Sequence, residues 1–192
     1  MGLSPVIAKL REGDEQTYRE LVEQYRDRIF NTALGLLQHS ENAEDVTQEV
    51  FIEVFRSVAA FRGDCTISTW MYRITVQKAL EHIRKGRRLK RSGIIVSLFG
   101  REDQVNLPGD PAFYHPGIML ENKERSAILF RAISKLPLNQ QTAFILHKVE
   151  GLSHNEIAGI MESSVSSVES LIVRARRRLR ELLSEYYEKN ER

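Results

Sequence analysis

Residues 152–180 read LSHNEIAGIMESSVSSVESLIVRARRRLR, and this stretch decides the fold of the second half of the chain. Its beginning is a capping box, in which the Ser153 hydroxyl accepts from the Glu156 amide while Glu156 reaches back. Leu152 and Ile157 occupy the two positions of a hydrophobic staple, which fixes how the chain enters the helix. The pattern predicts a helix to about residue 161 and a short turn at 162–164.

A second helix follows, and Ser166 to Glu169 reads as a second capping box that starts it. This spacing favours a cap-closing role for Glu169 over base reading. One face is apolar, with Val165, Val168, Ile172, Ala175, Leu179 and Leu182 at three-to-four spacing. The opposite side carries Ser167, Ser170, Arg174, Arg177 and Arg178. Such a pair of helices is typical of a helix-turn-helix that enters the DNA major groove. An ordinary helical hairpin with solvated arginines remains the alternative.

Helical periodicity also dominates the first half. Apolar stripes predict three helices, which carry Tyr18 to Leu36, Val46 to Val58 and Ile67 to Ile83. Gly13-Asp14 is a plausible break and cap before the first helix, and residues 61–66 read as a loop. Residues 93–118 hold three of the five prolines and no sustained period. We therefore expect an all-α chain of two small domains, 1–92 and 119–192, joined by an irregular linker at 93–118.

The charge is segregated along the 192 residues, although the formal net charge is only +2. Residues 11–53 hold eleven acids and four bases, whereas residues 82–101 hold seven bases and no acid. Residues 173–180 add five arginines without an acid. Solvated helix faces explain any one of these runs, but two acid-free basic runs favour two anion-binding surfaces beside an acidic, protein-binding one.

Several classes of protein are disfavoured by composition. The single cysteine, Cys65, excludes an internal disulfide framework and a multi-cysteine metal site. The five histidines lack the spacing of metal ligands, so we expect no metal, no cofactor and no enzymatic activity. Without an apolar run long enough for a membrane span, or an apolar start typical of a signal peptide, a cytoplasmic protein without membrane insertion is expected.

Both halves of the chain resemble one family, the extracytoplasmic-function sigma factors of the sigma-70 family. The most specific stretch is AEDVTQEVF at 43–51, followed by FRGD at 61–64 and STWMYRI at 68–74. In the second half, Leu136-Pro137, EGLSHNEIA at 150–158 and RAR at 174–176 match the family pattern. The resemblance covers nearly the whole chain, and the motifs occur in the family's order and spacing.

The resemblance implies a promoter-specificity subunit of bacterial RNA polymerase. Its implied partners are the core enzyme, through the beta-prime clamp helices and the beta flap, promoter DNA, and an anti-sigma factor. The implied residues for core binding are Asp45, Gln48, Glu49 and Phe51. Those for the −10 element are Phe61, Arg62, Gly63, Asp64, Cys65, Thr66, Trp70, Arg73, Gln77, Arg84, Lys85, Arg87 and Arg88. Packing is nevertheless the favoured role of Trp70, and Cys65 is interpreted as a small side chain in the loop.

The second domain is implied to bind the −35 element. Its candidate residues are Ser166, Ser167, Ser170, Leu171, Arg174, Arg176, Arg177 and Arg178. Leu171 flanks the polar face, where an apolar side chain can meet a thymine methyl. Three residues depart from the family pattern: Gln77 stands where the family often has Asn, and Glu169 and Leu171 where it often has basic residues. The rival interpretation is a helix-turn-helix regulator that acts without being a polymerase subunit.

Overall fold

The computed structural model describes residues 5–91 and 123–190, and every regular element in these two ranges is helical. The first range holds α1 (Pro5–Arg11), α2 (Glu15–Leu37), α3 (Ser40–Ser57), the short 3₁₀ turn η1 (Val58–Ala60) and α4 (Ile67–Arg91). The second holds α5 (Lys123–Ser134), α6 (Leu138–Lys148), α7 (His154–Ile160) and α8 (Val165–Asn190). The all-α prediction is confirmed. The linker predicted at 93–118 lies outside the described residues, so the domain boundaries stay a prediction.

Local sequence explains where the helices begin. The Asp14 carboxylate accepts from the Thr17 amide at 2.6 Å and caps α2, as predicted, directly after Gly13 with its φ of 78°. At α3, the residues Ser40 and Asn42 have side chains of the kind that usually cap a helix start. The structure instead uses His39, whose Nδ1 accepts from the Asn42 amide at 3.4 Å.

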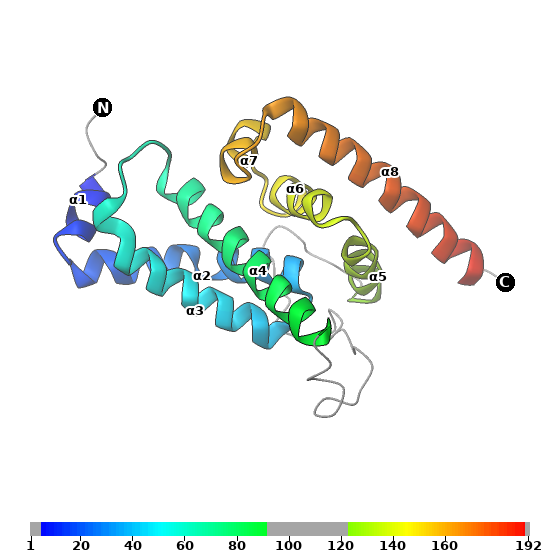
Figure 1. Ribbon diagram of the computed structural model, residues 1–192, viewed down its shortest axis with the longest axis horizontal. Helices are drawn as coiled ribbons and strands as arrows, with labels where there is room; N and C mark the ends of the chain where they lie inside the picture. The colour runs from blue at the N-terminus through cyan, green and yellow to red at the C-terminus, as the bar shows by residue number, and fades with distance from the viewer. Residues whose placement is uncertain (1–4, 92–122, 191–192) are drawn as a thin grey trace.

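Helices α1–α4 form one unit and α5–α8 a second, and Figure 1 shows them side by side. In the first unit α3 packs against α2 and α4 along its stripe of Val46, Val50 and Val54, all at most 1% exposed. In the second unit α6 and α8 pack together around Ile145, Leu146 and Val168. The buried apolar side chains of both units form one continuous cluster, to which each helix contributes the face that its periodic stripe predicts.

The two units also touch, through α4 against α7 and α2 against α6. The Gln141 amide, buried on α6, donates to the carbonyls of Gly35 and Leu36 at 3.0 and 3.2 Å. Gly35 allows a close approach here, because a Cβ at this position would lie 3.1 Å from Cδ1 of Ile145. Two backbone carbonyls of the first unit thus accept hydrogen bonds from a side chain of the second.

A buried carboxylate lies at the same contact. The Glu150 side chain is fully buried, and its Oε2 accepts from the Tyr72 hydroxyl at 2.6 Å. Nε of Arg28 lies 3.5 Å from the same oxygen, and its guanidinium is 5.5 Å from the Tyr72 ring centroid. Burial, and then the neighbouring Glu150, raise the pKa of Tyr72 above its ordinary range, so the phenol stays protonated and donates.

Candidate functional site

The capped turn between α7 and α8 presents the first candidate surface. The Ser153 amide donates to Glu156 at 2.9 Å, and the Glu156 amide donates to the Ser153 hydroxyl at 3.3 Å. The predicted capping box is therefore confirmed. Bonds from Ser153, the hydroxyl first, lower the pKa of Glu156, so the carboxylate is stabilised in its charged form.

The second predicted capping box, Ser166 to Glu169, is wrong. Helix α8 begins at Val165, and the hydroxyl of Ser164 accepts from the Ser167 amide at 3.2 Å. Serines stand at 163, 164, 166 and 167, so the local sequence offers several equivalent caps. Since Ser164 caps the helix, Glu169 does not close a cap, and its carboxylate lies near His154 of α7 instead.

The outward face of α8 is polar and basic, while Val168, Ile172, Ala175 and Leu179 turn inward and are buried. Of the −35 candidates, Ser166, Ser170, Arg174, Arg176, Arg177 and Arg178 are exposed and Ser167 is half-buried. Leu171 packs partly against the core, which leaves less of it for a thymine methyl. Val173, which was not among the candidates, is 63% exposed on this helix.

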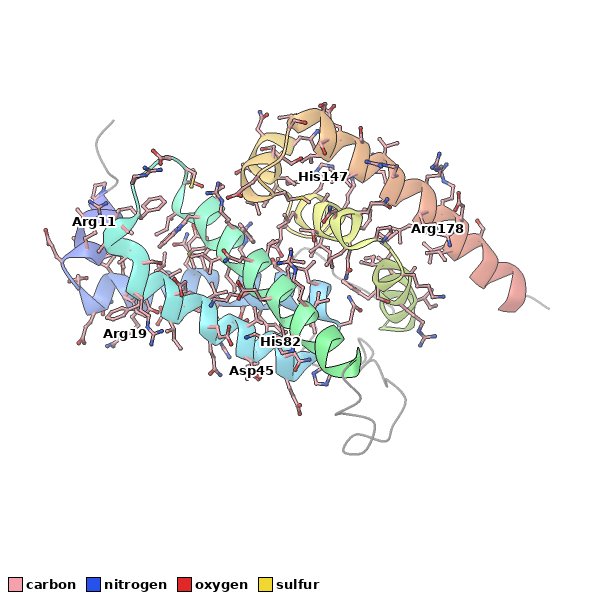
Figure 2. All side chains as sticks on the ribbon, viewed as in Figure 1. Arg11, Arg19, Asp45, His82, His147 and Arg178 are labelled. Atoms are coloured by element: carbon pink, nitrogen blue, oxygen red, sulfur yellow. The ribbon has the colours of Figure 1, made fainter. Side chains whose placement is uncertain are left out.

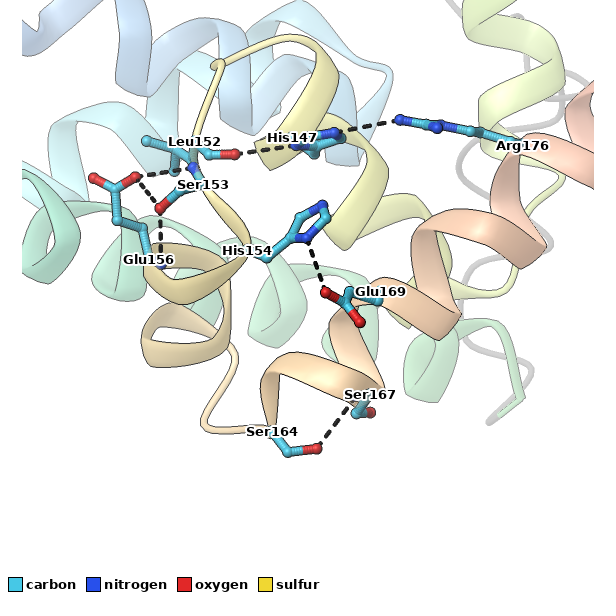
Figure 3. A network of polar contacts seen from close by, with 9 residues as sticks. All are labelled: His147, Leu152, Ser153, His154, Glu156, Ser164, Ser167, Glu169 and Arg176. Atoms are coloured by element: carbon cyan, nitrogen blue, oxygen red, sulfur yellow. Dashed lines mark hydrogen bonds and ion pairs between the residues drawn. The ribbon is translucent and has the colours of Figure 1, made fainter.

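A polar network joins this helix to α6 and α7, as Figure 3 shows. Nδ1 of His154 lies 3.5 Å from Oε1 of Glu169, and the rings of His154 and His147 lie in contact, with centroids 4.9 Å apart and planes tilted by 51°. His147 Nδ1 is 3.1 Å from the Leu152 carbonyl, and its Nε2 is 3.4 Å from the Arg176 guanidinium. Two histidines therefore lie beside two charged residues of α8.

The second candidate surface is the acidic side of α3. Asp45, Gln48 and Glu49 are exposed, and Figure 2 shows Asp45 on the side of α3 away from α5–α8. Phe51, the fourth candidate, is only 8% exposed, and its carbonyl accepts from the Tyr18 hydroxyl at 2.7 Å. Its side chain is a core residue and is not available on this face.

Two apolar residues that the sequence analysis did not select stand on α3 instead. Ile52 is 49% exposed and Phe55 is 62% exposed, with the Phe55 ring edge-on to Tyr18 at 5.4 Å. The i, i+3 and i+4 spacing places Ile52 beside Gln48 and Glu49. The face therefore combines acidic groups with apolar side chains, as a protein-binding surface does.

The loop of residues 61–66 is the third candidate. The Arg11 guanidinium donates to the Phe61 carbonyl and ties the start of the loop to α1. Phe61 is buried, and its ring lies 4.8 Å from that of Trp70, so Trp70 packs as predicted. The Thr66 hydroxyl accepts from the Thr69 amide at 3.1 Å and fixes the far end at α4.

Between these two anchors the loop is open to solvent. Arg62, Gly63, Asp64 and Thr66 are exposed and Cys65 is half-buried, packed on the core as a small side chain. Arg62 pairs with Asp64 at 3.2 Å, and Gly63 has a φ of 80°, a conformation that favours glycine. An exposed loop held at both ends can accept a ligand with little loss of order.

Helix α4 divides its candidate residues between solvent and the other unit. Gln77, Arg84 and Lys85 are exposed, with the Gln77 amide donating to Glu81 at 3.3 Å. Arg73 instead donates to the Gly159 carbonyl of α7 at 2.7 Å, so its guanidinium lies at the contact between the two units. The side chains of Arg87 and Arg88 lie outside the described part of the structure.

Within residues 5–91 and 123–190, no three His, Cys, Asp or Glu side chains gather as a metal site would require. In the same ranges no helix combines the length and the apolar character that crossing a bilayer needs.

Two family models match the chain. The model of Sigma-70 region 2 covers residues 21–89, and the model of Sigma-70, region 4 covers residues 126–179. The first contains the α3 face and the loop, and the second contains α7 and α8 as far as residue 179.

Full-length relatives agree with the family models. The RNA polymerase sigma-H factor of Pseudomonas aeruginosa is 33% identical over 175 residues, covering 89% of this chain and 88% of the relative. The ECF RNA polymerase sigma-E factor of Escherichia coli K12 is 32% identical over 172 residues, with the same coverage.

Solved structures share the fold. The sigma factor RpoE of Bartonella quintana, in complex with the anti-sigma factor NepR, has a TM-score of 0.69 at 22% identity, over 87% of this chain and 96% of that one. CnrH, in complex with the cytosolic domain of CnrY, has a TM-score of 0.67 at 21% identity, over 94% and 96%.

Proposed function

Because this chain belongs to the extracytoplasmic-function sigma factors of the sigma-70 family, we propose that three exposed surfaces give it the separate activities of a promoter-specificity subunit. The side of α3 with Asp45, Gln48 and Glu49 binds core RNA polymerase. The 61–66 loop and α4 read and open the −10 element, and α8 reads the −35 element. The single observation that carries the proposal is the outward face of α8, polar and basic above a buried apolar stripe.

Core binding follows from charge and shape together. Exposed carboxylates on α3 attract a basic partner such as the beta-prime clamp helices and raise the rate of encounter. Ile52 and Phe55 supply the apolar area that such a contact buries, and interface energy concentrates on residues of this kind. The second unit is expected to contact the beta flap.

The −10 contact uses the anchored loop. A base that leaves the stack enters a loop whose glycine permits close approach of the backbone, and Arg84 and Lys85 lie farther along α4 to bind phosphates of the separated strand. A flipped base that is held in this way stabilises the open duplex, so the protein melts DNA by binding rather than by catalysis.

The −35 contact uses α8 in the major groove. Arg174 is exposed, and its Nε donates to the Ser170 carbonyl at 3.1 Å, which orients the guanidinium near the helix start. Arginine pairs bidentately with guanine, and serines bind phosphates or bases. Because the similar RpoE and CnrH structures contain NepR and part of CnrY, we also propose an anti-sigma partner for this chain, which would act in the cytoplasm with the polymerase.

Run-off transcription tests the proposal. The full chain is mixed with bacterial core polymerase and promoter fragments of its own genome, and specific transcripts are expected that core alone does not make. Arg174→Ala should weaken recognition of the −35 element by about 1–3 kcal/mol. Arg19→Ala, an exposed arginine on α2, is the matched control. DNA binding without any affinity for core at low salt would contradict the proposal and favour a helix-turn-helix regulator.

A further inference from the structure

An acidic residue lies within the DNA-reading side of α8. Glu169, Val173 and Arg176 stand at i, i+4 and i+7, so they form one stripe beside the stripe of Ser166, Ser170 and Arg174. All three side chains of the Glu169 stripe are exposed. A carboxylate at this position repels the phosphates of a bound duplex, which costs affinity unless a cation compensates it.

The structure places that compensating group on another helix. His154, the first residue of α7, has its Nδ1 3.5 Å from Oε1 of Glu169. The other charged or titratable groups that face the pair are His147 of α6, whose ring contacts that of His154, and Arg176 of α8, which reaches His147. On α7 itself Glu156 is already engaged by Ser153. Figure 3 shows this arrangement.

We propose that His154 is a positioning residue for −35 recognition, which holds and neutralises Glu169 when its imidazole carries a proton. The inference rests on the proposed −35 role of α8. Imidazole is the side chain that gains and loses a proton near neutral pH, so a change of pH is a direct test of the compensation. A phosphate backbone beside the pair favours the protonated form, and DNA binding therefore takes up a proton.

The sign of the effect follows directly. When His154 is protonated, the Glu169 carboxylate is paired and the duplex meets a smaller negative charge. When His154 is neutral, the same carboxylate repels phosphate. Affinity for the −35 duplex therefore rises as the pH falls, by about two- to fivefold, because an exposed ion pair has a coupling of this size.

The experiment measures binding of the full chain to a labelled duplex that carries the −35 region of a promoter found by run-off transcription. The dissociation constant is followed by fluorescence anisotropy at constant salt between about pH 8 and pH 6, where imidazole titrates. The wild type should bind more tightly at low pH. His154→Gln should equal the wild type at high pH and lack the gain at low pH.

The partner residue gives the complementary result. Glu169→Gln should bind more tightly than the wild type at high pH and show a flatter pH profile. The double variant should match Glu169→Gln at high pH, where imidazole is neutral, and should lack any gain that Glu169→Gln keeps at low pH, because a protonated imidazole also attracts phosphate directly. His82→Gln, on α4, controls for general histidine titration, and circular dichroism checks that each variant folds.

Three results would overturn the inference. Weaker binding of Glu169→Gln would mean that Glu169 accepts a hydrogen bond from a base, such as a cytosine amine. If His154→Gln keeps the full increase in DNA affinity at low pH, the proton is taken up by His147 beside Arg176 instead. A wild-type pH profile without any gain would exclude proton uptake. If the wild type prefers no −35 duplex to a scrambled one at any pH, the proposed function itself fails, which is a separate result.

Discussion

Removal of one hydroxyl should loosen the contact between the two helical units. Tyr72→Phe deletes the donor that lies 2.6 Å from Oε2 of Glu150 and leaves the ring in place. Because the Glu150 side chain is fully buried, water does not replace the lost hydrogen bond. A hydrogen bond to a charged group contributes about 1.5–3 kcal/mol, so the ratio of joined to separated units should fall by about 10- to 150-fold.

Energy transfer between two dyes measures this ratio. Arg19 and Arg178 are exposed and lie in different units, so cysteines there report separation once Cys65 is replaced by serine. Tyr18→Phe is the matched control, because it deletes the same hydroxyl from a 2.7 Å bond that lies inside the first unit. In rising urea, below unfolding, Tyr72→Phe should lose energy transfer first. Equal transfer curves for Tyr72→Phe and the wild type, or equal opening in Tyr18→Phe, would refute the reasoning.

Three further outcomes are expected. Ser153→Ala should lower the free energy of unfolding by about 0.5–2 kcal/mol, as measured by urea denaturation. The hydroxyl lowers the pKa of Glu156 below its ordinary value of 4.5, so part of the stability lost in Ser153→Ala is lost in full only above that pH and shrinks in acid. A stability loss that does not change with pH would contradict this reasoning. Phe55→Ala should weaken core binding by about 1–2 kcal/mol in a titration with core polymerase. Ile7→Ala is the control, because Ile7 is buried in another part of the first unit. This control should lower folding stability but leave the core affinity of the folded protein unchanged. Tyr72, whose pKa burial raises, should contribute stability below about pH 10 and lose it at higher pH, so Tyr72→Phe should flatten the alkaline end of the stability profile.

Much of the fold follows from periodicity and local capping chemistry. The valine stripe of α3, the Asp14 cap and the Ser153 box each depend on residues within a few positions of one another, and the structure confirms all three. A helix reports its buried face through spacing alone, because neighbours on that face recur every three or four residues.

The errors arose where the deciding partner is distant in sequence or where neighbours compete. Phe51 and Phe55 both flank the valine stripe, and the packing of other helices against α3 decides that Phe51 is buried and Phe55 exposed. Glu169 was assigned to a cap because Ser166 stands at the right distance, but its partner, His154, lies on another helix. Long-range pairs of this kind leave no periodic signal in a sequence.

The hydrogen bond from Arg73 to the Gly159 carbonyl ties α4, which carries part of the proposed −10 site, to α7, which lies beside the proposed −35 helix. If Arg73 also serves the −10 strand, one guanidinium has two competing acceptors, and occupancy of either weakens the other. The two effects are reciprocal. A ligand that draws α7 away from α4 raises the affinity of α4 for the strand, and binding of the strand favours the release of α7 by the same factor. A positive coupling between core polymerase and single-stranded −10 DNA, lost in Arg73→Ala, would reveal this exchange.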